Sequence, residues 1–459
     1  MLKVPSLETN IGIEVYASKT RGIGGVIKCS PEDFIVEEIL TNGSKASVKL
    51  EDNNNLVNSL TDRGRYLICV LIKRGWDTLL AIEEMSKIIG IDPGRIGFAG
   101  IKDANALTSQ FISIGGVPIS KIQHMNITGL LIKPLGFSNE EISPKKLFGN
   151  SFTIVVRSIK LEEKNIRKRI EKINGELADF GGIPNFFGHQ RFGTIRPITH
   201  VVGKHVIKGD FEKAVITFLS YESPFESAKL REIRRELNES MDFKTSLKRF
   251  PKRLVYERLL LKHLSKNPHD YLGALHKLPL NLRKLFVQSY QAYLFNRFLS
   301  ERIKRGIPLK EAQVGDYMMR LDSLGLPQGS FIMAENSNIA FLNEEIKRGK
   351  MMLTLPLVGL KQPLSGGLQG EVEREILEVE GIAIEDFQRT KVIGVNMMGG
   401  LRVALERAMN FEVNIVTGNA YSGKSVKFRF ILHKGTYATI LLREYIKPTT
   451  DWQLINSGF

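Results

Sequence analysis

The sequence predicts an α+β protein in which a helix-rich middle region separates two regions that contain strands. Strand and helix periodicities alternate in residues 1–205, helical periodicity dominates residues 206–395, and strand alternation returns in residues 396–459. At 459 residues the chain is also about three times as long as a typical domain. We therefore expect two or more lobes, with boundaries near residues 205 and 395.

The first region contains two strand–helix pairs. Residues 66–75, YLICVLIKRG, predict a buried strand, and residues 77–90 predict a helix because their apolar side chains recur at helical spacing. These side chains are Leu79, Leu80, Ile82, Met85, Ile88 and Ile89. Residues 151–159, SFTIVVRSI, predict a second strand, and residues 160–177 a charged surface helix.

In the middle region, residues 282–299 predict an amphipathic helix that packs one apolar stripe on a core. The stripe consists of Leu282, Leu285, Phe286, Tyr290, Tyr293, Leu294 and Phe298. The Gly- and Pro-rich residues 355–370 predict a linker or an active-site loop. In the last region, the alternation in residues 425–432, SVKFRFIL, is typical of a half-buried strand.

The charge balance favours a polyanionic partner. The chain has 65 Lys and Arg against 49 Asp and Glu, a net charge of +16, and its pI is about 9.6. Nucleic acid is the first candidate. A membrane is not predicted, because no apolar run approaches the length of a spanning helix. Cys29 and Cys69 are too few for a disulfide framework, and no signal sequence is evident, so we expect a soluble protein of the reducing cytoplasm.

An NTPase is a real alternative, because residues 418–425, GNAYSGKS, satisfy the phosphate-binding pattern G-x-x-x-x-G-K-[ST]. That loop works when a helix follows it and aims its N-terminal amides at the phosphates. The residues after Ser425 instead alternate with a period of two, and only 34 residues follow it. A polar hairpin turn is the simpler interpretation.

No metal site or cofactor site is predicted. The histidines, including His200 and His205, lack the spacing of a zinc site, and no C-x-x-C or H-E-x-x-H occurs. The glycine-rich RGIGG at residues 21–25 has no strand before it, so it is a poor dinucleotide fingerprint.

Residues 95–111, RIGFAGIKDANALTSQF, place Asp103 after a glycine-rich approach. Judged alone, Asp103 is best explained as a helix N-cap. Three further segments change this interpretation: GVIKCSPEDFIVEEI at 25–39, PNFFGHQRFG at 184–193 and LHKGTYATILLREY at 432–445. Together with GIKD, in this order and across nearly the whole chain, they resemble the motifs of the TruD family of tRNA pseudouridine synthases.

The resemblance implies an isomerase that converts a uridine of tRNA, usually at position 13 in this family, to pseudouridine. It also implies a catalytic domain with a mixed, mainly antiparallel sheet flanked by helices. The outer regions would form this domain, and the middle region would be an inserted TRUD domain.

The chemistry agrees with a site without a cofactor. Uracil leaves C1′, turns and rejoins through C5, so every atom is kept and no electrons are exchanged. A carboxylate can add to C1′ or remove the 2′ proton, and the sequence leaves both routes open. By its place in GIKD, Asp103 takes the catalytic role, and Lys28 of the opening motif is our candidate for its cationic partner.

The same resemblance assigns substrate binding to Phe34, Asn185 and Tyr437, with Phe187 as a further stacking face. Aromatic faces can stack on an extruded base, and an amide can pair with the uracil edge. Without the resemblance, Phe34 and Phe187 would be interpreted as core aromatics. Tyr437 stands where relatives often have phenylalanine, so this motif matches less closely than GIKD.

The predicted partner is tRNA, and the sequence identifies no protein partner. The basic residues 243–253, FKTSLKRFPKR, suit a phosphate backbone, although a solvated surface explains them equally well. A catalytically silent RNA-binding protein is the third functional class, but it would be expected to lack Asp103.

Overall fold

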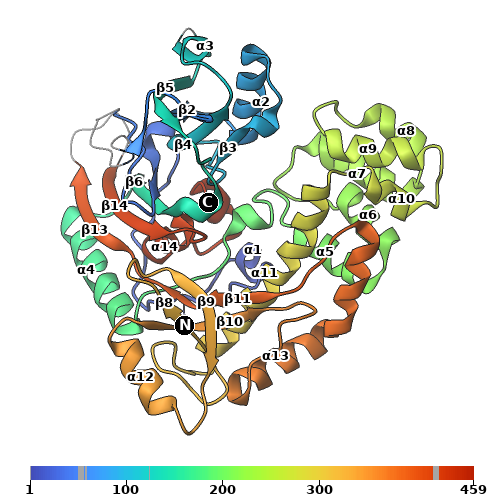
Figure 1. The fold of residues 1–459 in the computed structure, drawn as a ribbon. Coiled ribbons are helices and arrows are strands. Elements are labelled where there is room, and N and C mark those ends of the chain that lie inside the picture. The colour runs from blue at the N-terminus through green and yellow to red at the C-terminus, as the bar shows by residue number, and fades with distance from the viewer. Residues whose placement is uncertain (1, 50–55, 57–58, 124, 417–422) are drawn as a thin grey trace.

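The structure is a computed structural model that describes residues 2–49, 56, 59–123, 125–416 and 423–459. Within these residues the largest sheet has eight strands in the order β13-β14-β6-β1-β4-β2-β5, with β3 paired to β4 (Figure 1). All of its pairings are antiparallel except β1 with β4. The strands are β1 (Phe34–Leu40), β2 (Tyr66–Arg74), β3 (Ile96–Phe98), β4 (Leu107–Gly115), β5 (Leu130–Ser138), β6 (Leu147–Ile159), β13 (Met409–Val416) and β14 (Lys424–His433).

Helices cover the two halves of one face of this sheet. Over β6 and β14, the helices α4 (Glu163–Phe180) and α14 (Ala438–Ile446) bury one apolar cluster. Over β2 and β4, the helix α2 (Thr78–Ile89) buries a second cluster. The short helices α1 (Ser6–Thr9), α3 (Ser120–Gln123) and α15 (Asp451–Asn456) lie nearer the chain ends and sheet edges.

Between these two clusters the same face carries two polar residues, Thr108 and Lys73, in one row with the apolar Val36. Val36 of β1 pairs with Thr108 of β4, which pairs with Lys73 of β2. Paired residues of neighbouring strands point to the same side. We call these three residues the central row, and each of them is at most 3% exposed. A buried lysine in the middle of a sheet needs acceptors above it, and the loop that carries Asp103 supplies them.

A second body contains a four-stranded sheet in the order β11-β10-β8-β9. Its strands are β8 (Tyr317–Leu321), β9 (Pro327–Met333), β10 (Met351–Leu357) and β11 (Gly400–Val403), and its helices are α11 (Leu280–Lys304), α12 (Ile339–Lys347) and α13 (Gly367–Glu380). A two-stranded pairing of β7 (Ile183–Pro184) with β12 (Leu405–Glu406) connects this body to the large sheet.

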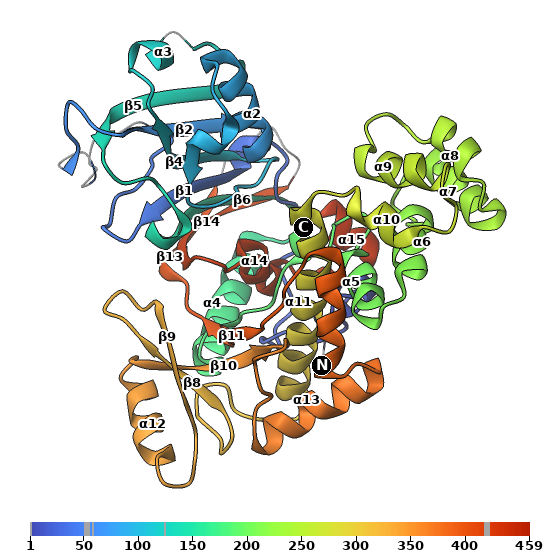
Figure 2. The same ribbon diagram turned by 45° about the vertical axis from the view of Figure 1, so that its right-hand side comes forward.

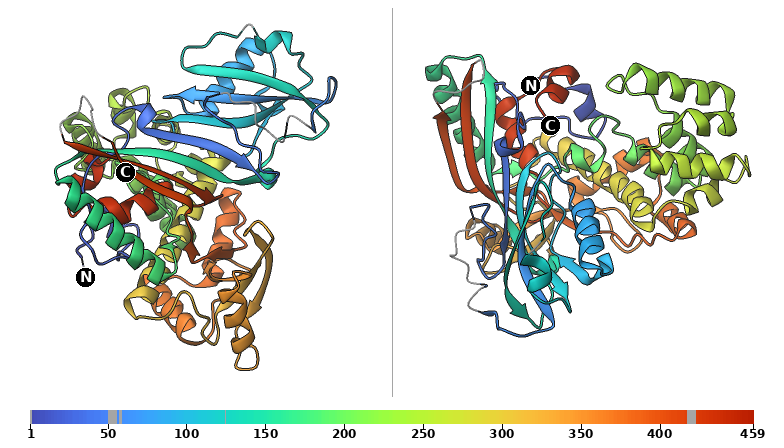
Figure 3. Two further views of the ribbon diagram at one scale, coloured as in Figure 1. Left: turned by 90° about the vertical axis from the view of Figure 1, so that its left-hand side faces the viewer. Right: turned by 90° about the horizontal axis from the view of Figure 1, so that it is seen from above.

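A third body is entirely helical and projects away from the large sheet (Figures 2 and 3). It contains α6 (Phe211–Ser220), α7 (Ala228–Ser240), α8 (Phe243–Arg249), α9 (Val255–Leu264) and α10 (Tyr271–His276), and α5 (Thr199–Lys208) joins it to α11. Residue 205 lies inside α5, and β11 begins after residue 396 but pairs with β10 of the middle region. No helix within the described ranges is long and apolar enough to cross a membrane.

The predicted strands and helices are confirmed, but the buried faces predicted for the helices α2 and α11 are not. On α2, Leu79, Leu80 and Ile88 are more than half exposed, so the buried face is narrower than the apolar spacing suggests. On α11, burial extends around the helix from Phe286 to Arg302 and is not confined to one stripe. A helix that is enclosed on several sides has no single apolar stripe. This applies to α11 because it packs against α13 and β10 of the second body and against α5, which leads to the third body.

A buried ion pair attaches the N-terminal segment to α14. The Arg443 guanidinium donates to both carboxylate oxygens of Glu8, at 2.9 and 2.8 Å, and both side chains are 1% exposed. Burial alone would raise the pKa of Glu8, but Arg443 and a nearby His189 outweigh it and lower the pKa to about 2. The charged form of Glu8 is therefore the one that stabilises the fold.

We predict that Glu8→Gln lowers the free energy of unfolding by about 3–5 kcal/mol at pH 7, because it removes the bidentate partner of the buried Arg443 and leaves Glu444, at 3.1 Å, as its counter-charge. Because the pKa of Glu8 is lower in the folded state than its unfolded value of 4.5, its ionisation stabilises the folded state at pH values above 4.5. This stabilisation is lost as the pH falls towards 2. The difference between wild type and variant in urea unfolding should therefore shrink below pH 4.5. The control is Glu163→Gln, whose exposed pair with Arg167 should contribute under about 1 kcal/mol. A difference that is constant with pH would contradict this account.

Candidate active site

The loop of residues 99–106 joins β3 to β4 and crosses the central row. Lys73 reaches up from the sheet and its ammonium donates to the main-chain oxygens of Trp76, Lys102 and Asp103, at 2.7, 3.2 and 2.7 Å. Burial lowers the pKa of Lys73 to about 8, although the charge of Asp103 opposes this shift. The Thr78 hydroxyl at the start of α2 accepts from the Lys102 amide at 3.0 Å. The backbone around Asp103 is thus fixed from below and from one side.

The Asp103 carboxylate itself remains accessible. Its side chain is 31% exposed, and its nearest cation is Lys28, whose ammonium lies 3.4 Å from Oδ1. Lys28 has a φ of 60°, in the left-handed region that is uncommon for a residue with a side chain. Its ammonium also lies 4.5 Å from the centre of the Phe34 ring, a cation–π contact that helps to hold it in place.

A second buried pair supports the loop. The Lys102 ammonium lies 2.7 Å from Oε2 of Glu38, and neither side chain is more than 4% exposed. Glu38 follows the last residue of β1 that pairs with β4, and its Oε1 accepts from the Phe111 amide of β4 at 3.1 Å. The carboxylate therefore continues the hydrogen bonding between these strands where their backbones no longer pair.

The other predicted site residues gather around Arg402 of β11. Its guanidinium donates to the Asn185 side-chain oxygen at 2.6 Å and to the Gly435 carbonyl at 2.9 Å. It also lies 4.0 Å from the centre of the Phe187 ring, and that ring meets Tyr437 edge-on at 6.2 Å. Burial lowers the pKa of Arg402 to about 10, so it stays charged at neutral pH.

The site residues thus form two groups, one with Lys28, Phe34 and Asp103 and one around Arg402. Both attach to the same apolar cluster, through Ala106 of the loop and Ala438 beside Tyr437. A row of the sheet also connects them. Glu38 pairs with Asn150, which pairs with Leu432 just before the turn that leads to Tyr437.

Sequence reasoning missed several members of the site. Lys73 carried a signal, a lysine inside the apolar strand YLICVLIKR, and so did Arg402, a lone charge in LRVAL. Asn150 carried none. Its side-chain oxygen is buried and has no hydrogen-bond partner among the described residues, so it is an acceptor that a ligand could satisfy.

Two predicted base-binding residues are enclosed in this structure. The Phe34 ring is 1% exposed and packs edge-on to Phe152, beneath Lys28. The Asn185 side chain is 2% exposed, and its amide nitrogen donates to the Val403 carbonyl. Stacking on Phe34 would require the ring to be uncovered, and pairing of a base with Asn185 would require its present bonds to be exchanged. Both roles stay predictions, and so does stacking on Phe187, which is 8% exposed and covered by Arg402.

The phosphate-loop pattern does not lead into a helix. Residues 418–422 of the pattern lie outside the described residues, but Lys424 and Ser425 begin β14, where a phosphate loop requires a helix. Within the described part of the chain, no three His, Cys, Asp or Glu side chains form a group that could hold a metal ion.

The family model described as tRNA pseudouridine synthase D (TruD) matches residues 10–445. The chain belongs to this family. A relative from Methanococcoides burtonii, named "Probable tRNA pseudouridine synthase D", is 38% identical over 449 residues, which cover 97% of this chain and 98% of the relative. A relative of the same name from Methanosarcina mazei is 37% identical, with 97% and 98% covered.

The fold is shared as well. A crystal structure from Methanosarcina mazei, described as that of the "Putative tRNA pseudouridine synthase D (TruD)", has a TM-score of 0.81 to this chain at 34% identity, and the match covers 98% of this chain and 100% of that one. The predicted α+β class is confirmed, and the family is one of isomerases that act on tRNA.

We predict that Lys73→Met loosens the loop of residues 99–106. The substitution removes the ammonium that donates to the carbonyls of Trp76, Lys102 and Asp103, at about 1–3 kcal/mol for each group that stays unsatisfied, and the Lys102 carbonyl keeps the Thr78 hydroxyl as a second donor. Amide hydrogen exchange in this loop should become faster, while exchange in β14 stays slow. Lys87→Met is the matched control, because Lys87 is 63% exposed on α2. Unchanged exchange in residues 99–106 would show that Lys73 does not hold the loop.

Proposed function

We propose that this protein converts a uridine of tRNA, with position 13 as the usual target of its family, to pseudouridine with Asp103 as the catalytic carboxylate. The observation that carries the proposal is the Asp103 carboxylate, which is accessible and faces the Lys28 ammonium on a loop whose backbone is fixed by Lys73. A rigid loop with one exposed reactive group suits a reaction in which position decides the rate.

Asp103 acts on the ribose of an extruded nucleotide. Its carboxylate adds to C1′, or removes the 2′ proton to give a glycal, and in both routes uracil is released, turns and rejoins through C5. The Lys28 ammonium, 3.4 Å from Oδ1, balances the charge of this carboxylate when the nucleotide displaces water. Every atom of the substrate is retained, so the reaction calls for no cofactor.

The group around Arg402 binds the uracil or the phosphate beside it. Nε and Nη2 of Arg402 donate within the protein, and Nη1 has no hydrogen-bond partner among the described residues, so it remains for a ligand. Tyr437 provides aromatic surface near this guanidinium, which itself packs on the buried Phe187 ring. Asn150, with its unsatisfied oxygen, is a suitable acceptor for an N–H of uracil.

The inserted helical body would hold the rest of the tRNA. On α8 and just after it, Lys244, Lys248, Lys252 and Arg253 are exposed, whereas Arg249 is paired with glutamates of α7. We propose residues 206–395, with β11 added, as this insertion, and the cytoplasm as the place of action because tRNA is the substrate.

We predict that Asp103→Asn abolishes pseudouridine formation and leaves tRNA affinity within about twofold, because an amide keeps the shape but neither adds to C1′ nor takes a proton. Chemical mapping of pseudouridine in an unmodified tRNA transcript measures the product, and filter binding measures affinity. The control is Asp92→Asn, which should stay active. Asp92 is the N-cap of the short helix Pro93–Arg95, ahead of the loop of residues 99–106. Product formation by Asp103→Asn at the wild-type rate would falsify the assignment.

We predict that Lys424→Ala keeps full activity and that the protein does not bind ATP, because Lys424 begins a strand. Pseudouridine mapping and equilibrium dialysis with labelled ATP test the two parts. Saturable ATP binding that disappears in Lys424→Ala would instead favour the NTPase alternative.

A further inference from the structure

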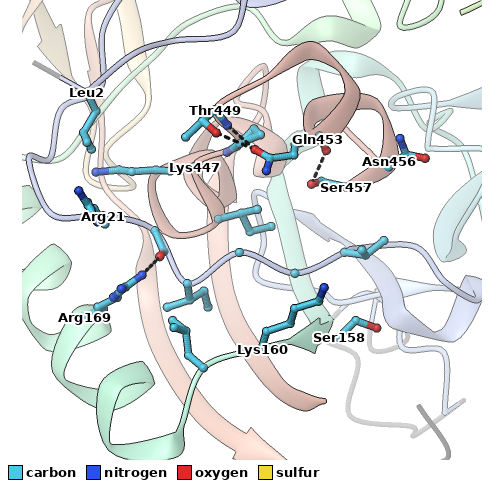
Figure 4. Close-up of a pocket in the computed structure, with 18 of the residues that line it drawn as sticks. Leu2, Arg21, Ser158, Lys160, Arg169, Lys447, Thr449, Gln453, Asn456 and Ser457 are labelled. Atoms are coloured by element: carbon cyan, nitrogen blue, oxygen red, sulfur yellow. Dashed lines mark hydrogen bonds between the residues drawn. The ribbon is translucent and has the colours of Figure 1, made fainter. Parts of the chain in front are cut away.

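A cavity of about 760 Å³ lies beside residues 22–26, where segments from both ends of the chain meet (Figure 4). The glycine-rich segment crosses it, with Thr449, Gln453 and Asn456 on one side and Lys160 and Arg169 on the other. A Cβ on Gly24 would meet no atom within 4 Å, so the backbone here faces open space. This is the RGIGG segment that the active site does not use.

The lining of the cavity is positively charged. Lys3, Arg21, Lys160, Arg169 and Lys447 all contribute to it, and no Asp or Glu does so among the described residues. Lys447 is occupied, because its ammonium donates to Ser18 and Thr20 at 2.6 Å. Arg169 donates to the Gly22 carbonyl at 2.5 Å. Lys3, Arg21 and Lys160 have no ion-pair partner within the described ranges.

An exposed aromatic ring lies at the same cavity. Trp452 of α15 is 69% exposed and lines it. Cations beside an exposed aromatic ring are the combination that binds single-stranded nucleic acid, since the cations attract phosphate and the ring stacks on any base. A metal ion would not favour this lining, because the described residues contribute cations and no carboxylate to it.

The cavity is close to the catalytic centre along the chain. Val26 lines it, and Lys28, which contacts Asp103, is only two residues further on. Two residues span at most about 7 Å. A nucleotide near the target uridine is therefore within reach of the cavity while the target lies at Asp103.

We propose that this cavity binds one nucleotide of the RNA substrate, with its phosphate on Arg21 and Lys160 and its base on Trp452. This proposal rests on the proposed function, because it assigns a second contact to the same tRNA. The cavity takes no part in the chemical step and holds the RNA through a nucleotide other than the target.

The test measures tRNA binding without turnover. Arg21→Gln combined with Lys160→Gln should weaken tRNA binding about tenfold and reduce the slope of log affinity against log salt by about 0.7–0.9 for each lost phosphate contact. Trp452→Ala should weaken binding at least about fivefold, as expected for a lost base stack. All three side chains are exposed, so the fold should tolerate these changes.

The matched controls lie on α12, which is remote from the C-terminal helices (Figures 1 and 2). Lys347→Gln and Phe341→Ala remove a lysine and an aromatic ring that are 68% and 54% exposed, and neither should change tRNA affinity. Fluorescence identifies the contact directly. Binding of tRNA should quench wild-type emission more strongly than that of Trp452→Phe, and uridine monophosphate should not do so at micromolar concentration.

Weaker binding in the cavity variants together with unchanged controls supports the proposal. Unchanged affinity in both cavity variants overturns it, and so does an equal loss in the controls. Micromolar binding of uridine monophosphate with unchanged tRNA affinity would make the cavity a site for free nucleotides and would also overturn it. Failure of this proposal and failure of the proposed function can be told apart. The cavity variants are tested by their affinity for tRNA, whereas Asp103→Asn is tested by the amount of pseudouridine formed.

Discussion

The buried ammonium of Lys73 is the interaction on which the site depends. A lysine in the middle of a sheet face is unfavourable by itself, because its charge loses water. The carbonyls of Lys102 and Asp103 in the loop above it, together with the Trp76 carbonyl just after β2, replace that water. The sheet and the loop therefore stabilise each other. Without the loop, Lys73 would lose the Lys102 and Asp103 carbonyls as acceptors, and without Lys73 these carbonyls would lose a donor. The accessible carboxylate of Asp103 follows from this arrangement, since its backbone is held while its side chain is left free.

The same principle recurs around the molecule. Glu38 accepts from a strand amide and forms an ion pair with Lys102, while Glu8 accepts from Arg443 and Asn185 from Arg402. In each case a charged group that is buried or half-buried joins segments that are far apart in the chain. Such pairs contribute little net stability compared with apolar packing, but removing one partner is costly. They therefore fix which segments lie together at the site, while the apolar clusters provide most of the stability.

Much of the fold could be predicted from the sequence because its strands and helices have clear patterns, such as the unbroken apolar run of residues 66–72 and the alternation of residues 425–432. Asp103 and Lys28 were predicted from motifs, and in the structure the Lys28 ammonium lies 3.4 Å from Oδ1 of Asp103. The exposed apolar residues of α2 and the burial around α11 could not be predicted, because they depend on which bodies pack against each helix. Asn150 and Arg402 were missed for a similar reason, since only strand pairing and the β11 register bring them near the motif residues.

The position of β14 has a consequence for how the chain folds. β14 pairs with β6 and thereby covers an edge of the large sheet, yet more than half of the chain separates these two strands. During synthesis β1, β2, β4 and β6 emerge long before their last partner, so β6 keeps an open edge while the two other bodies form. Long-range pairing of this kind folds slowly, and an open edge invites association with other chains. The helical insertion, rich in local contacts, can fold first and keep the ends of the unfinished sheet close together until β14 arrives.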